Sequence, residues 1–280
     1  MNKFMRTELL VLTTGKEIKD GEICVIGQGV PMAAGAIAKK NHAPNSIILT
    51  EAGMIDIDCI QNLESVGDPG STIGYSYCID LWDVFTTIVN KGYADISILG
   101  CAQIDKFGNI NSTVIGKYDM SKRSYFRLPG SGGANEFAGH SNRTVYTMVG
   151  GKFCEKLDYL TTPGWLTGGD SRKKAGLPGG PSALITRVGV FRFEGVTKEI
   201  YLDAIFPQTT VEEVKKLVPW DLKIAEDFGK ELKKIPLPNK KELEYIREFE
   251  PFFGISGNLG RRLQSQVLPV YYEQGNVPHE

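Results

Sequence analysis

Short apolar runs rich in β-branched residues recur along the first two thirds of the chain, separated by segments long enough for helices. Runs that are apolar on both faces are typical of strands buried in a parallel sheet. The predicted strands are residues 22–27, 46–50, 95–100, 144–149 and 157–161. Two predicted helices are residues 32–40, with alanines at helical spacing, and residues 78–91, with one apolar face made of Leu81, Val84, Phe85 and Ile88. This alternation predicts an α/β fold, with a mainly parallel sheet flanked by helices.

The pattern changes after residue 180. Residues 182–194 and 198–206 are two apolar runs separated by a glycine turn, which predicts antiparallel strands added to the sheet. Thr210 and Glu213 have the spacing of a capping box before a short helix, and Asn239 marks the start of another helix. We therefore expect a single domain over residues 1–250. The tail, residues 251–280, has no strong periodicity, so it either lies along a partner or is loosely ordered.

Composition narrows the class of protein. Hydrophobic residues make up 41% and charged residues 23%, and the formal net charge is -1. A nucleic-acid partner is not expected, because phosphate backbones are bound by clustered positive charge. The chain has no apolar run of the length that a membrane span needs and no signal-peptide pattern. Five cysteines without a CxxC pair predict neither a zinc site nor a disulfide framework, and Cys24 and Cys101 lie in apolar runs that predict burial. A reducing cytoplasm is the expected compartment.

Two motifs follow predicted strands directly. The first, Gly27-Gln28-Gly29-Val30-Pro31, combines flexible glycines with a proline suited to the first turn of a helix, so it can present backbone N–H groups to an anion. The same spacing also fits a tight turn without a ligand. The second, Glu51-Ala52-Gly53, places a carboxylate at the end of a buried strand, where open α/β sheets have their active sites. A glutamate that caps the next segment would show the same pattern.

A third motif lies at residues 130–138 and begins Gly130-Ser131-Gly132-Gly133-Ala134-Asn135. Its small residues precede an expected helix and offer successive N–H groups that can hold an anion or polarise a carbonyl oxygen. A flexible surface loop is the alternative. Ser131 is not expected to be a nucleophile, because neither a G-x-S-x-G elbow nor a histidine partner is present.

Other polar residues give weaker signals. His42, His140 and His279 are the only histidines, and no pair of them has metal-ligand spacing, so a metal site is not expected. His140 follows the third motif and is either near a substrate or a surface residue. The charged run 171–174 fits a contact with a phosphate or carboxylate, or a solvated face.

The ordered set of motifs is more specific than any one of them. It comprises Gly27, Gly29 and Pro31; Glu51, Ala52 and Gly53; the segment Gln103-Ile104-Asp105-Lys106-Phe107-Gly108-Asn109; Gly130, Gly132, Gly133 and Ala134; residues 158–165; and Leu177-Pro178-Gly179. With this set the chain resembles the family I coenzyme A (CoA) transferases over roughly residues 8–250, and within them the glutaconate-type beta subunits.

The resemblance implies a CoA-transferase-like fold and a role for each motif. Glu51 would attack an acyl-CoA thioester and become covalently acylated. The loops with Gly27, Gln28, Gly29 and Val30, and with Gly130, Gly132, Gly133, Ala134 and Asn135, would stabilise oxyanions and bind CoA. Ala52, Gly53, Gln103 and Trp165 would lie near the substrate. CoA enters as a thioester substrate, and no permanently bound cofactor is implied.

The resemblance also implies a partner. In this family the active site forms between two homologous subunits, so an alpha-type subunit is expected, together with a carboxylic acid substrate of the dicarboxylic, glutaconate- or glutarate-like kind. One alternative is an acyl-CoA C–C hydrolase or decarboxylase of the same superfamily, although the relatives compared lack the glutamate at this position. A more distant alternative is a non-catalytic ligand-binding or assembly subunit, which would need no Glu51.

Overall fold

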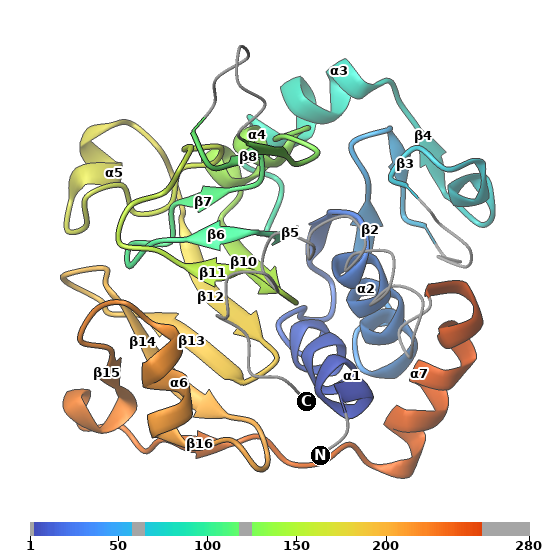
Figure 1. Ribbon diagram of the computed structural model, residues 1–280. Coiled ribbons are helices and arrows are strands. Elements are labelled where there is room, and N and C mark those ends of the chain that lie inside the picture. Colours follow the sequence, from blue (N-terminus) through green and yellow to red (C-terminus); the bar gives the residue numbers. More distant parts are fainter. Residues whose placement is uncertain (1–2, 58–64, 118–124, 254–280) are drawn as a thin grey trace.

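The computed structural model describes residues 3–57, 65–117 and 125–253, and one mixed sheet runs through them (Figure 1). Its order is β15-β14-β13-β12-β10-β5-β1-β2-β3-β4, and β16 also pairs with β14. The strands are β1 (Ile23–Ile26), β2 (Ile47–Leu49), β3 (Met54–Ile55), β4 (Tyr77–Cys78), β5 (Ile96–Gly100), β10 (Arg143–Met148), β12 (Pro181–Thr186), β13 (Gly189–Phe193), β14 (Ile200–Ile205), β15 (Lys223–Ile224) and β16 (Lys233–Lys234). The predicted α/β class is confirmed.

The centre of the sheet is parallel. The five strands β2-β1-β5-β10-β12 all run in one direction, as the buried apolar runs predict. The chain passes from β1 to β2 on one side and later reaches β5 on the other side of β1. Between β1 and β5 the order therefore reverses, and sheets of this kind bind ligands at the carboxyl ends of the strands that flank such a switch point.

Helices cover both faces of the sheet. One face carries α1 (Lys3–Gly15), α2 (Val30–Asn41) and α7 (Lys240–Phe253), and the other carries the π-helix η2 (Val84–Val89), α4 (Ala134–His140) and α6 (Val211–Leu217). Side chains alternate accordingly: Cys24 and Ile26 of β1 join the core under α1 and α2, and Val25 joins the opposite core.

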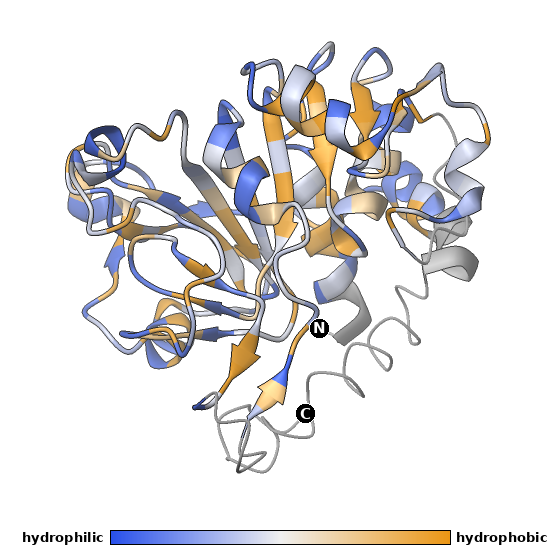
Figure 2. Ribbon diagram, turned by 90° about the horizontal axis from the view of Figure 1, so that it is seen from above, coloured by the Kyte–Doolittle hydropathy of each residue, from blue (hydrophilic) through white to orange (hydrophobic). Residues whose placement is uncertain are grey.

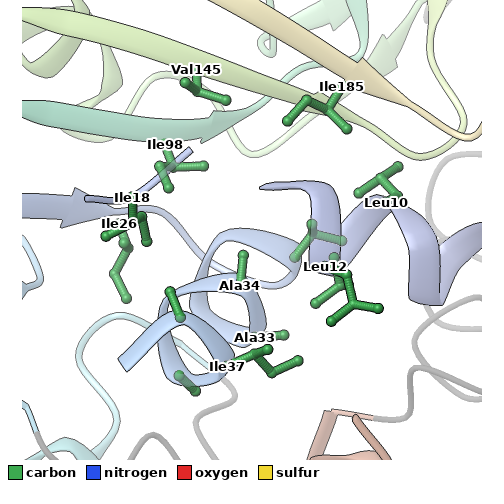
Figure 3. Packing of buried hydrophobic residues seen from close by; sticks show 14 of the residues in the cluster. Leu10, Leu12, Ile18, Ile26, Ala33, Ala34, Ile37, Ile98, Val145 and Ile185 are labelled. Atoms are coloured by element: carbon green, nitrogen blue, oxygen red, sulfur yellow. The ribbon is translucent and has the colours of Figure 1, made fainter. Parts of the chain in front are cut away.

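The core under α1 and α2 is densely apolar (Figure 3). Leu10 of α1, Ile37 of α2 and Ile185 of β12 are buried in it, and each such side chain contributes about 1.5–3 kcal/mol. Figure 2 shows the same division, with hydrophobic strands inside and mixed helices and loops around them. The helix α1 is an element that the strand-and-helix pattern does not predict.

Smaller elements lie beside the main sheet. They are the three-stranded sheet of β6 (Gln103–Ile104), β7 (Ile110–Asn111) and β11 (Lys152–Phe153), the hairpin of β8 (Val114–Ile115) and β9 (Phe126–Arg127), the helices α3 (Leu81–Asp83) and α5 (Ser171–Lys174), and the 3₁₀ turns η1 (Pro69–Thr72) and η3 (Ala225–Phe228). In the described part of the chain, no helix is long and apolar enough to cross a membrane.

Both predicted helix starts are confirmed. The Thr210 side chain accepts a hydrogen bond from the Glu213 N–H, and the Glu213 carboxylate accepts one from the Thr210 N–H. Asn239 and Glu242 make the equivalent pair of hydrogen bonds before α7. Helix α7 crosses the expected boundary at residue 250 and reaches Phe253. Residues 254–280 lie outside the described residues, so the expectation for the tail stays a prediction.

Three element predictions are wrong in detail. Residues 182–194 were predicted as one strand but form two antiparallel strands, β12 and β13. The Thr186 hydroxyl accepts hydrogen bonds from the Val188 and Gly189 N–H groups and so closes a turn between them. Residues 157–161 are not a strand, and only an isolated bridge joins Thr162 to Ile110.

The predicted helix at 78–91 begins later and has a different face. Cys78 belongs to β4, the helix starts at Leu81, and it continues as the wider π-helix η2. Leu81 is 54% exposed, whereas Val84 is buried. The predicted apolar face assumed one α-helix, and the change of pitch at η2 turns its first residue out of the core.

Candidate active site

The Gly27–Val30 turn lies at the switch point of the sheet. The Gly27 N–H donates to the Ile98 carbonyl of β5 over 2.9 Å, which joins the end of β1 to its neighbour. Gly29 has φ of 82°, a conformation that favours glycine, and α2 begins at Val30. Gln28 is exposed at the tip of this turn. The sequence prediction of a glycine turn at a helix start is confirmed, and the turn lies at the carboxyl edge of the sheet.

Glu51 stands at the same edge. Val25 of β1 pairs with Leu49 of β2, so Gly27 and Glu51, each two residues further along, leave the sheet side by side. A tight turn follows, in which the Gly53 N–H donates to the Thr50 carbonyl. Gly53 has φ of 100°, and a Cβ there would lie 1.8 Å from the Ile79 carbonyl oxygen, so only glycine fits. Ala52 and Gly53 therefore shape the backbone that presents Glu51.

The third glycine motif meets Glu51 directly. The Gly133 N–H donates to Oε2 of Glu51 over 2.7 Å, a contact between residues 82 positions apart. A Cβ on Gly132 would lie 3.3 Å from Oε1, and one on Gly133 would lie 2.5 Å from Oε2. Among the described residues, Oε1 has no hydrogen-bond partner. The carboxylate is thus held by one oxygen, and its other oxygen is available for bond formation.

Two aromatic rings fix the loop that carries this contact. Phe85 of η2 and Phe137 of α4 stack with ring centroids 5.1 Å apart. A Cβ on Gly133 would lie 2.6 Å from the Phe85 ring and 2.9 Å from the Phe137 ring. At the other end of the loop, the Gly130 N–H donates to the Ser112 carbonyl, and the Ser112 hydroxyl donates to the Gly130 carbonyl. The loop is therefore clamped at both ends and is not the flexible surface loop of the alternative interpretation.

The neighbouring motif residues have other partners. Ala134 opens α4, and its N–H donates to the Ser131 carbonyl; Asn135 is exposed on the first turn. Gln103 is buried and hydrogen-bonds Asp158 and Asn111. The Trp165 indole N–H donates to the Pro181 carbonyl, and its ring packs against Gly180. The contacts of Gln103 and Trp165 thus lead away from Glu51, and their nearness to a substrate stays a prediction.

Arg172 of the charged run has a structural role. It is 1% exposed and donates to the carbonyls of Ala138, Gly164 and Pro178. Burial lowers the pKa of its guanidinium from the ordinary value. The backbone carbonyls satisfy a charge that is costly to bury, and they join the end of α4 to two loops. Lys173 and Lys174 are exposed, as a solvated face predicts, and their contact with a phosphate or carboxylate stays a prediction.

Two of the described thiols are held in the unreactive, protonated form, while Cys78 is exposed. Burial raises the pKa of Cys24 and of Cys101 to about 12, so both are protonated near neutral pH. No group of three metal-ligating side chains is found among the described residues. His42 faces the Ile18 carbonyl and His140 pairs with Glu136, while His279 lies outside the described residues.

Sequence reasoning did not identify Phe85, Phe137 or Ile79 as parts of the site. Phe85 was predicted only as part of an apolar helix face, and Phe137 lay within the third motif without an assigned role. Ile79 contributes its backbone carbonyl, which no residue type reveals. Gly133 is the signal that could have indicated the packed rings, because a glycine between predicted elements often marks a close approach by another group.

Comparison with known proteins places this chain in a family. The coenzyme A transferase family model matches residues 10–217. The beta-type subunit of glutaconate CoA-transferase from Acidaminococcus fermentans is 33% identical over 88% of this chain and 92% of its own. The corresponding subunit of 3-oxoadipate CoA-transferase from Pseudomonas knackmussii is 32% identical over 89% of this chain and 95% of its own. The chain belongs to the coenzyme A transferase family.

Solved structures agree with this assignment. The crystal structure of the Acidaminococcus fermentans glutaconate coenzyme A-transferase matches with a TM-score of 0.80 and 32% identity, over 89% of this chain and 96% of that chain. The decarboxylase AibA/AibB matches with a TM-score of 0.73 at 23% identity, over 90% of this chain and 98% of that chain, and shows the shared fold alone. The relatives that share about a third of their residues with this chain are thus beta-type subunits of transferases named for glutaconate and 3-oxoadipate.

Substitution of Gly133 tests the packing of the site. We expect Gly133→Ala to lower the free energy of unfolding by about 1–3 kcal/mol, because the new methyl group meets Glu51, Phe85 and Phe137. Gly139→Ala is the matched control on the same helix, since a Cβ there meets nothing within 4 Å. It should be neutral or stabilising by up to about 1 kcal/mol. Urea unfolding measures both, and equal stability of the two variants would contradict the described packing.

Proposed function

We propose that this chain is the beta-type subunit of a CoA-transferase and that Glu51 carries the CoA group between two carboxylic acids. The observation that supports it most strongly is the hydrogen bond from the Gly133 N–H to the Glu51 carboxylate at the carboxyl edge of the sheet. A carboxylate is a weak nucleophile in water, but one that is positioned and partly withdrawn from solvent can attack a thioester.

The reaction runs in two halves. Oε1 of Glu51 attacks the thioester carbonyl, the carbon–sulfur bond breaks, and a mixed anhydride forms with release of the CoA thiolate. The thiolate then attacks the glutamyl carbonyl, the anhydride bond breaks, and the first acid leaves as a carboxylate. A second carboxylate reverses both steps on the resulting glutamyl-CoA thioester. No water is consumed, so the thioester bond is conserved.

The two steps of each half develop negative charge on different oxygens. When the thiolate attacks the glutamyl carbonyl, the oxyanion forms on the Glu51 oxygen that the Gly133 N–H already contacts. Donors placed in this way typically contribute about 3–4 kcal/mol to the transition state. When Glu51 attacks the thioester, the oxyanion forms on the carbonyl oxygen of the acyl-CoA. We assign its stabilisation to backbone N–H groups of the Gly29–Val30 turn at the neighbouring strand end.

The substrate class follows from the relatives. Glutaconate and 3-oxoadipate, for which the two similar transferases are named, are both dicarboxylic acids. We therefore propose an acyl-CoA and a dicarboxylic acid as substrates, with CoA bound only as a substrate and no resident cofactor. The compartment we propose is the cytoplasm, where the cysteines stay reduced. The decarboxylase likeness shows the fold alone and does not favour a second function.

A homologous alpha-type subunit completes the proposed enzyme, and one surface suits it. Five large apolar side chains are exposed along residues 73–82, close to the segment that carries Glu51: Ile73, Tyr75, Tyr77, Leu81 and Trp82. We call them the apolar patch. Strand β4 within it pairs with β3, and the Ile79 N–H donates to the Gly53 carbonyl. Exposed patches of this kind mark interaction sites, and a partner here would cover Glu51 from water.

Replacement of Glu51 tests the proposed role. We expect Glu51→Gln to lower CoA transfer from glutaryl-CoA to acetate at least about 1000-fold in the complex with its alpha-type partner. The amide still accepts the Gly133 hydrogen bond but cannot serve as the nucleophile. Glu136→Gln, at an exposed glutamate on α4, should transfer CoA normally. Initial rates followed by chromatography measure both variants. Activity of Glu51→Gln within tenfold of the wild type would exclude a covalent role for this residue.

Substitution in the apolar patch tests the partner interface. Trp82 is 71% exposed, and Trp82→Asp is expected to weaken association with the alpha-type subunit by about 2 kcal/mol or more, as for other interface aromatics. Val196→Asp is the control, because Val196 is 78% exposed in the turn between β13 and β14. Sedimentation velocity of co-expressed subunits at several concentrations gives the affinity. Equal affinity of the two variants would place the interface elsewhere.

A further inference from the structure

A polar pocket of ≈ 440 Å³ lies beside the glycine loop that holds Glu51. Its polar lining comes from three segments: Thr113 and Arg127 of the β8–β9 hairpin region, Ser131 and Asn135 around the start of α4, and Tyr159 and Thr161 of the loop after β11. This volume is within the usual range for small-molecule sites. None of these residues has a role in the mechanism proposed above.

Arg127 gives the pocket its charge. It is the only charged residue among the described lining residues, and its one described hydrogen bond runs from Nη1 to the Thr113 carbonyl over 3.3 Å. Its Nη2 lies 3.5 Å from the point that a Gly130 Cβ would occupy. A guanidinium has five N–H donors in a planar fork that matches a carboxylate. Arg127 is exposed, so most of these donors face solvent and are accessible to a ligand in the pocket.

The hydroxyl groups beside Arg127 are held in place. The Thr113 and Thr161 hydroxyl oxygens lie 2.7 Å apart, and the Ser112 N–H donates to the Thr161 hydroxyl. Thr113 and Thr161 are fixed by hydrogen bonds within the protein, so they line the pocket with neutral polar groups that do not repel an anion. The lining as a whole favours a carboxylate over an apolar chain end.

The two contacts are no further apart along the loop than a dicarboxylate can reach. Arg127 adjoins Gly130, and Glu51 accepts the Gly133 N–H, so three chain steps separate the two contacts. Three steps span at most about 11 Å. The two carboxyl carbons of glutarate are about 5 Å apart in an extended chain of ordinary bond lengths. With contacts of about 3 Å at each end, glutarate can bridge a guanidinium and a carboxylate that are about 11 Å apart.

We propose that Arg127 binds the second carboxylate of the substrate while the first reacts at Glu51, and so selects dicarboxylic over monocarboxylic acids. The proposal rests on the transferase function proposed above. Arg127 forms no bond with the reacting atoms; its pairing with the distal carboxylate positions the acid. Binding of this kind acts on substrate and transition state alike, so it lowers KM more than it raises kcat.

The test compares two acids of equal carbon number in the complex with the alpha-type subunit. With acetyl-CoA as the donor, glutarate and pentanoate are the acceptors, and kcat and KM are measured for each. We expect Arg127→Met to lower kcat/KM for glutarate on the order of 10- to 100-fold, mainly through KM, and to leave pentanoate within about threefold. Arg127→Lys keeps the positive charge but loses the planar pair of N–H donors, so kcat/KM for glutarate should lie between the values for the wild type and Arg127→Met. Lys174→Met, at an exposed lysine outside the pocket, is the control.

The outcomes separate this proposal from the proposed function. If Arg127→Met lowers kcat/KM equally for both acids, Arg127 has a structural role. If kcat/KM for glutarate is unchanged, the second carboxylate binds elsewhere. Either result overturns the proposal while the transferase function stands. A wild-type complex that transfers CoA to neither acid overturns both. As an internal check, the Arg127→Met complex should still take up CoA from acetyl-CoA without an acceptor, because that half-reaction involves no second carboxylate.

Discussion

One hydrogen bond organises the site: the Gly133 N–H donates to the Glu51 carboxylate over 2.7 Å. It exists only because position 133 carries no side chain, since a Cβ there would meet Glu51 and two aromatic rings within 2.9 Å. Glu51 in turn is placed by Gly53, whose own Cβ would collide with the Ile79 carbonyl. Gly53 and Gly133 are thus required by close packing in the segments that position one carboxylate, and chain flexibility explains neither of them.

The sheet topology brings these distant motifs together. Parallel strands end at the same edge, so the turns after β1 and β2 meet there, and the reversal of strand order between β1 and β5 leaves room above that edge. The stacked rings of Phe85 and Phe137 then carry the loop before α4 to Glu51. Buried Arg172 holds the far end of α4 through backbone carbonyls. Core packing on this face therefore sets the geometry of the site.

The sequence predicted the parts that depend on local pattern. The parallel strands, the glycine turn before α2 and both capping boxes follow from periodicity and capping chemistry, which act over a few residues. The errors have three different causes. A local turn at Thr186 splits residues 182–194, and a change of helix pitch exposes Leu81. Arg172 is buried by tertiary contacts although its run is typical of a solvated face. Glu51 was predicted, but its contact with Gly133 was not, because nothing in either motif records a partner 82 positions away.

The measurement that tests the central claim most directly is a search for the covalent intermediate. The complex of this chain with its alpha-type subunit is incubated with glutaryl-CoA in the absence of an acceptor acid, and this chain is analysed by intact and tandem mass spectrometry. We predict a gain of one CoA less one water, located at Glu51 and lost when an acceptor acid is added. A catalytically active complex that carries no adduct, or an adduct at another residue, would contradict the covalent role of Glu51.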